Sequence, residues 1–147
     1  MALSRSCHTI TPTAFGLAIQ ALVFLSLSEN VCPSQQIAKM MKSGTTFMRR
    51  IMGPLVRANL VEAREGRDGG YILAKSAHVI TVADVYRALQ MNDPLGAGLL
   101  SSTTADCPNG KAIKNVFSEM ATQAEKSVLN VYEQYTIEQI ATRATGN

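Results

Sequence analysis

Four polar side chains that lie close together in the sequence suit contacts with double-stranded DNA. Thr45 and Thr46 are short enough to meet base edges or phosphates, and Arg49 and Arg50 follow after one helical turn. Positive charge at this spacing is what a helix needs in order to enter the major groove. Phe47 lies between the two pairs and belongs to the same candidate contact segment.

The sequence around these residues predicts two helices joined by a tight turn. We expect the first helix over residues 34–41, the turn over 42–44 and the second helix over 45–56. Ala38 stands where the two helices must approach closely. The apolar inward faces are formed by Ile37, Met48, Ile51 and Leu55. This pattern is typical of a helix-turn-helix, whose second helix reads DNA with its N-terminal residues. Gly53-Pro54 predicts a bend or interruption, because proline lacks a backbone donor and crowds the preceding turn.

A β-hairpin is predicted directly after the second helix. Its strands span residues 60–64 and 71–75, and Asp68-Gly69-Gly70 is a strong turn signal in which both glycines can take positive φ angles. A hairpin in this place is a wing, and its basic tip, Arg64 and Arg67, can reach a minor groove or phosphates. A phosphate-cradling loop fits these glycines poorly, because they precede a strand and no Lys-Ser/Thr pair follows them.

Two further helices are marked by their capping residues. Thr11 caps a helix expected over residues 11–28. Thr81 caps another within residues 80–89, with Asp84 completing a weak capping box. Both segments carry apolar residues at helical spacing, so both are expected to face the core.

The last third of the chain combines a predicted loop with a predicted long helix. Residues 91–110 are rich in glycine, proline, serine and threonine, which favours a loop. Residues 111–135 carry an apolar stripe at steps of three and four, formed by Ile113, Val116, Phe117, Met120, Ala124, Val128 and Val131. This stripe could pack on the chain's own core or on a second copy. We expect the second copy, because readers of symmetric operators need two heads about 34 Å apart. Thr136 is expected to cap a final helix over residues 137–142.

These elements predict a single, mainly α-helical domain over residues 1–147 with a small β-hairpin. A winged helix-turn-helix core over residues 11–90 precedes the loop and the long helix. Residues 39–75 hold eight basic and three acidic side chains, a net charge of +5, whereas the whole chain carries +3. A basic face beside a neutral-to-acidic remainder fits a nucleic-acid surface, although an ordinary solvated face would also produce it.

Several other classes of protein are disfavoured. The apolar segment 15–27 is too short to cross a bilayer and lacks the flanks of a signal peptide, so we expect a cytoplasmic protein without membrane contact. Cys7, Cys32 and Cys107 are widely spaced and form no C-x-x-C pair, which supports neither a disulfide framework nor a closed zinc site. No catalytic triad, paired carboxylates or metal-ligand constellation is legible, so neither an enzyme nor a metal site is expected.

In its order of elements and in several segments, the chain resembles the Rrf-two (IscR/NsrR-like) family of bacterial winged-helix regulators. The resemblance covers residues from about Leu17 to Ile140. The matching segments are residues 18–22 with Leu25, residues 37–38, 47–51 and 55–61, Gly66 with residues 69–74, and residues 80–85 and 107–113. The wing together with Ile80-Thr81-Val82-Ala83-Asp84-Val85 is the more specific part of the match.

The resemblance implies a homodimeric, sequence-specific DNA-binding regulator, usually a repressor. The family's contact positions fall on residues named above: Thr45, Thr46, Arg49, Arg50 and the wing residues 64–70. Glu65 stands where many members have an arginine, and Asp68 replaces a further glycine. The alternative is a protein–protein adaptor that keeps the winged-helix fold without DNA function.

Cluster-sensing members of this family hold an iron–sulfur cluster with three closely spaced cysteines before the long helix. This chain has only Cys107 in that loop, so a conventional iron–sulfur cluster is disfavoured and no cofactor is expected. A regulator with an unknown ligand, a thiol-based redox switch at Cys107 and an inert buried cysteine remain as alternatives. The position of Cys107 near a predicted helix N-terminus can make its thiol reactive, but this does not place the redox switch ahead of the inert, buried cysteine.

Overall fold

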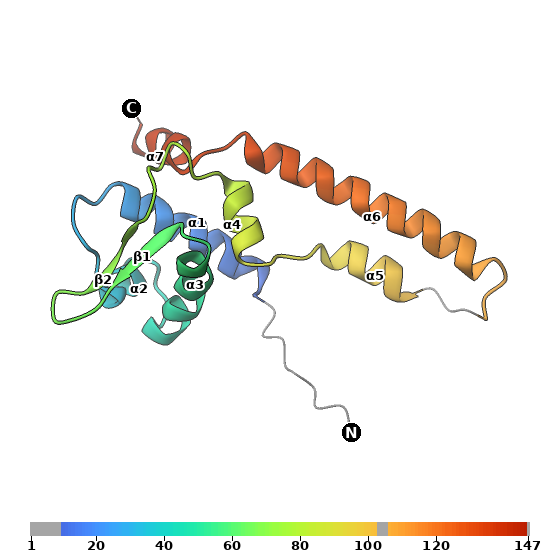
Figure 1. Cartoon of the computed structure of the whole chain (residues 1–147), viewed down its shortest axis with the longest axis horizontal. Coiled ribbons are helices and arrows are strands. Elements are labelled where there is room, and N and C mark those ends of the chain that lie inside the picture. The colour runs from blue at the N-terminus through green and yellow to red at the C-terminus, as the bar shows by residue number, and fades with distance from the viewer. Residues whose placement is uncertain (1–9, 103–105, 147) are drawn as a thin grey trace, which may run out of the picture. The chain divides into compact units, whose positions relative to one another are not determined.

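The structure is a computed structural model that describes residues 10–102 and 106–146 (Figure 1). Within these residues the chain forms two compact units, one of residues 10–91 with 135–146 and one within residues 92–134. The first contains α1 (Pro12–Ser26), α2 (Ser34–Met40), α3 (Thr45–Arg57), β1 (Val61–Arg64), β2 (Gly70–Leu73), α4 (Val82–Ala88) and α7 (Ile137–Thr145). The second contains α5 (Pro94–Ser102) and α6 (Gly110–Glu133). The mainly α-helical winged-helix class is confirmed.

The core of the first unit is built on α1. The helix begins as predicted, with the Ala14 N–H donating to the Thr11 hydroxyl at 3.3 Å and proline in the first turn. α1 packs against α3, α4 and α7. Leu22, Ile51 and Ile137 are buried in one cluster, so α7 belongs to the same core as the helix-turn-helix despite its distance in sequence.

The helix-turn-helix consists of α2 and α3. Ala38 is only 2 % exposed, in agreement with its predicted position where the two helices approach each other. In the turn, Lys42 adopts a left-handed φ of 48°, and the Ser43 N–H donates to the Ala38 carbonyl at 2.9 Å. The predicted interruption at Gly53-Pro54 is absent, because α3 continues to Arg57. Four buried side chains on one face hold the helix through the proline: Met48, Ile51, Met52 and Leu55.

The wing is an antiparallel pair of strands in which Val61 lies opposite Leu73 and Arg64 opposite Gly70. Cys32 adds a short bridge to β2: its N–H donates to the Tyr71 carbonyl and its carbonyl accepts from the Tyr71 N–H, both at 2.9 Å. A Cβ atom at Gly70, whose φ is 156°, would collide with the Cys32 carbonyl. The wing is therefore fixed to the chain that enters α2.

The glycine conformations in the wing differ in part from the prediction. Gly70 has a positive φ as expected, but the other positive φ, 103°, occurs at Gly66 and not at Gly69. Gly69 is needed for a different reason. A Cβ atom there would overlap with the Arg64 carbonyl across the turn.

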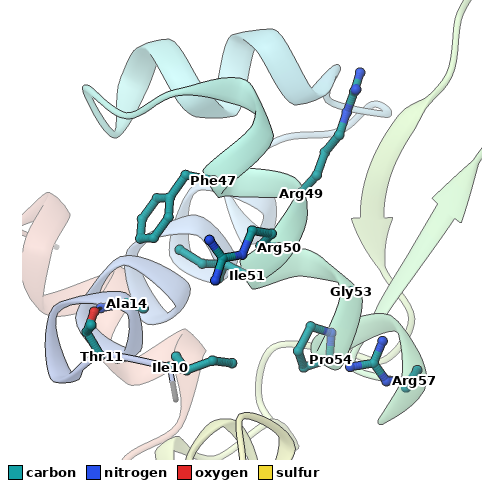
Figure 2. Close-up of a pocket in the computed structure, with 10 residues that line it drawn as sticks. All are labelled: Ile10, Thr11, Ala14, Phe47, Arg49, Arg50, Ile51, Gly53, Pro54 and Arg57. Atoms are coloured by element: carbon teal, nitrogen blue, oxygen red, sulfur yellow. Dashed lines mark hydrogen bonds between the residues drawn. The ribbon is translucent and has the colours of Figure 1, made fainter. Parts of the chain in front are cut away.

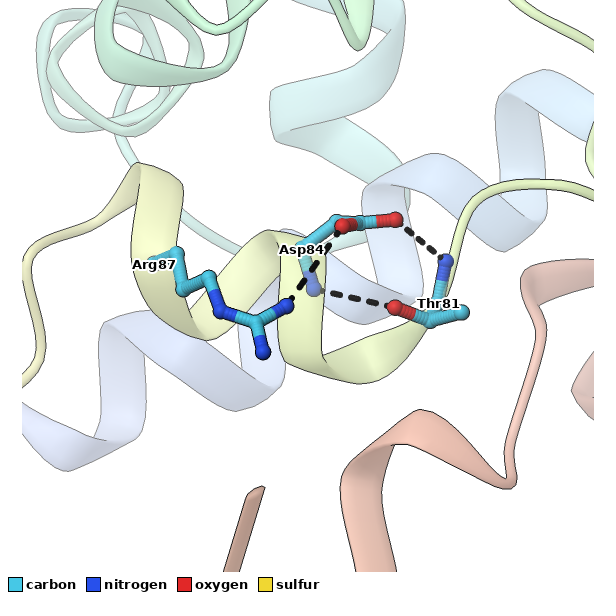
Figure 3. Close-up of polar contacts among 3 residues, drawn as sticks. All are labelled: Thr81, Asp84 and Arg87. Atoms are coloured by element: carbon cyan, nitrogen blue, oxygen red, sulfur yellow. Dashed lines mark hydrogen bonds and ion pairs between the residues drawn. The ribbon is translucent and has the colours of Figure 1, made fainter. Parts of the chain in front are cut away.

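The starts of α4 and α7 lie next to each other in the first unit. At α4, the Asp84 N–H donates to the Thr81 hydroxyl at 3.1 Å and the Thr81 N–H donates to the Asp84 carboxylate at 2.9 Å (Figure 3). Thr136 and Gln139 form an equivalent capping box at α7. Thr81 and Thr136 also pair in an isolated β-bridge, so the two predicted caps hold two helix ends together.

The second unit contains a helix, α5, where the sequence favours a continuous loop over residues 91–110. The Asp93 carboxylate accepts hydrogen bonds from the N–H groups of Leu95 at 3.0 Å and Gly96 at 2.8 Å, which starts the helix. α5 then packs along α6 (Figure 1). A Cβ atom at Gly96 would lie 2.9 Å from the Asp93 carboxylate and 3.1 Å from the Ala121 side chain, so this glycine leaves room both for the helix cap and for close packing on α6.

The long helix α6 agrees closely with its predicted bounds. Its face toward α5 includes Ala121, whereas the predicted apolar stripe lies on a neighbouring face of the helix. Val116 and Met120 in the stripe are 52 % and 51 % exposed, and Phe117 is half-buried. The other stripe members are also exposed: Ile113, Ala124, Val128 and Val131.

Candidate nucleic-acid interface

The outward face of α3 is polar and basic. Thr46, Arg50, Gly53 and Arg57 follow one another at steps of four, three and four residues, which places them in one row along the helix. The three side chains of this row are exposed, whereas the opposite face of α3 is buried in the core. The packing of α3 therefore leaves its basic row available to a partner.

Arg49 lies beside this row on the side of the wing. It lines a groove of about 530 Å³ together with Ser34 and Gln35 at the start of α2 and with Arg64 and Gly66 of the wing. The groove brings the predicted α3 and wing residues to one surface. Gly69 and Gly70 line it as well, and the positions of both are set by close backbone contacts.

The wing carries charges of both signs. The Arg64 Nε atom lies 3.1 Å from the Glu62 carboxylate, and both side chains are about half exposed, 54 % each. Such an exposed pair contributes little to stability and can exchange its partner for a phosphate. Arg67 is exposed at the tip between Glu65 and Asp68. The wing is therefore a weaker cationic surface than the α3 row.

The side of α3 that lies away from the wing faces the start of α1. Phe47, Arg50 and Arg57 line a pocket of about 450 Å³ there. Arg49 also belongs to its lining, although Figure 2 shows the Arg49 side chain extending away from it. Phe47 is half-buried and packs against the core, and Thr45 is half-buried at the first position of α3. Arg57 was not among the predicted contact residues. Its spacing of seven residues from Arg50 is the signal that would have placed it on the same face.

The structure also locates the cysteines. Cys107 is exposed, so its interpretation as a buried, inert thiol is wrong. Cys32 is buried beside the wing, and Cys7 lies outside the described residues. No helix among residues 10–102 and 106–146 is long and apolar enough to span a membrane.

Comparison with known proteins identifies the family. A sequence model of the Rrf2 family, described as "Iron-dependent Transcriptional regulator", matches residues 11–143. The chain belongs to the Rrf2 family. Its members are transcriptional regulators and not enzymes, and the winged helix-turn-helix described above is the DNA-binding element of this fold. The suspected resemblance is thereby confirmed.

Individual Rrf2 relatives agree with this result. YwgB of Bacillus subtilis (strain 168), named as a candidate HTH-type transcriptional regulator, is 34 % identical over 71 residues, which are 47 % of this chain and 46 % of YwgB. The chain thus spans about half the length of the curated relatives that it matches first.

Solved structures show the same fold. IscR of T. potens has a TM-score of 0.64 at 23 % identity, with 91 % of this chain and 87 % of IscR covered. CymR, the global cysteine regulator of B. subtilis, has a TM-score of 0.63 at 21 % identity, with 90 % and 96 % covered. At these identities the likeness concerns the fold alone.

The iron dependence in the Rrf2 family description can be tested against the donor atoms of this chain. Among the described residues, no group of three or more His, Cys, Asp or Glu side chains could hold a metal ion. Cys107 is the single cysteine in the described part of the second unit, and an iron–sulfur cluster normally requires several thiolates. This donor set does not fit a conventional iron–sulfur cluster.

Proposed function

We propose that this Rrf2-family chain is a homodimeric, sequence-specific DNA-binding repressor that acts in the cytoplasm. α3 enters the major groove with Thr45, Thr46, Arg49 and Arg50, and the wing follows the minor groove or adjacent phosphates with Arg64 and Arg67. The observation that carries this proposal is the exposed basic row of α3 beside the groove that Arg49 and the wing residues line. Arginine suits both phosphates and guanine edges, so the same face can supply affinity and sequence recognition.

The homodimer is supported by the apolar stripe of α6. Seven apolar residues recur on one face of a 24-residue helix, and none of them is fully buried in the single chain. Exposed apolar surface of this extent marks an interaction site in soluble proteins. A second copy of α6 offers the matching surface, and a two-fold dimer would present two reading heads to a symmetric operator.

The test is whether the purified chain binds DNA fragments from the region upstream of its own gene and retards them in a gel, which is called DNA retention from here on. Binding should weaken steeply as salt rises, because phosphate contacts release counterions. Arg49→Ala or Arg50→Ala should cost about 1–3 kcal/mol of binding free energy where the side chain meets a base edge. Lys126→Ala removes an exposed cation from α6 and should leave binding unchanged. Equal binding by the parent and both arginine variants would rule out α3 as the reading helix.

The repressor role is tested with a reporter gene under the control of a retained fragment. Expression should fall when the parent chain is present and recover with the arginine variants. If no upstream fragment is retained at moderate salt, the adaptor interpretation is favoured. The fold would then serve protein contacts.

A second candidate property is thiol-based redox control through Cys107. The exposure of this thiol favours it, because oxidants reach exposed cysteines first. Oxidation before α6 would alter the unit that carries the proposed dimer surface. This property concerns the control of DNA binding and not binding itself.

A further inference from the structure

The pocket between α1 and α3 combines an apolar floor with a cationic rim. Its floor is formed by Ala14 and Ile51, both almost fully buried, and by the half-buried Phe47 and Pro54. The volume of about 450 Å³ lies in the range of about 300–1,000 Å³ that is usual for small-molecule sites. The pocket belongs entirely to the first unit.

Two exposed guanidinium groups stand at the edge of this floor. Figure 2 shows Arg50 in front of Ile51 and Arg57 beside Pro54. Neither arginine forms an ion pair or hydrogen bond with the residues that the structure describes, and no acidic side chain lines the pocket. The rim is therefore a concentration of uncompensated positive charge directly beside apolar surface.

We propose that this pocket binds a small amphiphilic anion, a carboxylate carried on an apolar body, and that its binding releases DNA. The carboxylate would accept hydrogen bonds from Arg50 and Arg57, while the apolar body covers Phe47 and Ile51. A phosphate ion lacks the apolar body, and a neutral alcohol lacks the charge, so neither satisfies both halves of the pocket.

Release of DNA follows from the position of Arg50, which lies in the same row of α3 as Thr46 and is assigned above to the DNA-reading face. A guanidinium group that is neutralised by a bound carboxylate cannot at the same time neutralise a phosphate. This consequence depends on the proposed DNA-binding function, whereas ligand binding itself does not.

Ligand binding is measured first, without DNA, on the full chain. 8-Anilinonaphthalene-1-sulfonate serves as a fluorescent anionic probe, and octanoate, octanol and inorganic phosphate are compared as competitors. Octanoate should displace the probe, while octanol and phosphate should be at least about tenfold weaker. Equal competition by octanol, or by phosphate, would overturn the proposal.

Two variants assign the binding to this pocket. Arg50→Gln combined with Arg57→Gln should raise the dissociation constant of octanoate at least about tenfold, while Lys75→Gln, an exposed cation after β2, should not change it. Gly53→Met fills the pocket from α3 and keeps both arginines in the sequence, although a Cβ atom at position 53 would already lie 3.5 Å from the Arg57 guanidinium. It should also abolish octanoate binding, and methionine suits a helix better than glycine does. Octanoate binding that survives in both variants would place the site elsewhere.

DNA retention is then measured with and without octanoate. Octanoate should reduce retention by the parent at concentrations near its own dissociation constant. If octanoate binds but the chain retains no DNA fragment, the proposed DNA-binding function is wrong and the proposed ligand site remains supported. If DNA is retained and octanoate does not bind, the pocket proposal fails and the two arginines belong to the DNA face alone. If octanoate and DNA bind to the chain at the same time, the proposal that the ligand releases DNA is wrong.

Discussion

At the scale of single residues, Gly70 determines how the wing is held. Its lack of a side chain allows β2 to pass directly over the Cys32 carbonyl, and the paired hydrogen bonds between Cys32 and Tyr71 depend on that approach. Any other residue would bring a Cβ atom into the backbone of residue 32. The wing and the entrance to α2 are thus coupled through one glycine.

Gly70→Ala should therefore destabilise the fold by about 1–3 kcal/mol, through backbone strain and overpacking. Denaturant unfolding measures this change. Gly16→Ala is the matched control, since a Cβ atom in this part of α1 meets nothing within 4 Å, and it should be neutral or stabilise by up to about 1 kcal/mol. A Gly70→Ala variant as stable as the parent would show that the wing does not depend on this contact.

Cys107 is the residue on which redox control would depend. Treatment of the parent with hydrogen peroxide should lower DNA retention, and Cys107→Ser should retain DNA to the same extent before and after treatment. Cys32→Ser should respond like the parent, because Cys32 is buried and reached poorly by oxidants. A Cys107→Ser variant that still loses retention would exclude this cysteine as the sensor.

At the scale of elements, the paired capping boxes join α4 to α7. The Val82 N–H donates to the Tyr135 carbonyl and the Ile137 N–H donates to the Ile80 carbonyl, both at 2.9 Å, so the two helix starts share backbone hydrogen bonds. α7 is thereby attached to the winged-helix core, although α5 and α6 separate it from α4 in the sequence. Loss of either capping box should therefore affect the starts of both α4 and α7.

Thr81→Ala should cost about 1 kcal/mol of unfolding free energy, the usual value of an N-cap. Thr81→Ser keeps the hydroxyl group and should recover most of that loss. Chemical denaturation followed by circular dichroism is a suitable measurement. An alanine variant no less stable than the serine variant would mean that the hydroxyl group contributes nothing at this position.

The prediction of elements from sequence was most accurate where a local signal decides the structure. Thr11, Thr81 and Thr136 each start a helix as expected, because a cap acts on backbone groups within one turn. α5 was missed for the opposite reason. Its glycines are poor helix formers taken alone, and one of them, Gly96, allows close packing against Ala121 of α6. The Asp93-Pro94 pair was a readable start signal for this helix.

At the scale of the whole molecule, function depends on how the chain associates with a second copy. The stripe of α6 is apolar and exposed in one chain. A charge placed within it should therefore leave the monomer stable and destabilise a dimer that buries the stripe. Met120 lies in the middle of this stripe. It is the position at which the proposed dimer can be tested with least effect on the first unit.

Met120→Glu should weaken dimerisation on the order of several kcal/mol, because two carboxylates would be buried without partners. Sedimentation velocity should give about twice the chain mass for the parent and a single-chain mass for the variant. Lys126→Glu changes charge on the same helix outside the stripe and should remain dimeric. A parent that sediments as a monomer, or a Met120→Glu variant that stays dimeric, would contradict the proposed interface.

The sequence by itself determined which segments become helices, apart from α5, where the wing lies, and that Thr46, Arg49 and Arg50 stand near the start of an amphipathic helix. These properties follow from caps, apolar periodicity and turn residues, all of which act over a few positions. Only the tertiary structure decided that Cys32 anchors the wing and that Arg50 and Arg57 border an apolar pocket beside α1. Such contacts join residues far apart in the chain, and no local pattern encodes which distant backbone or side chain will meet them.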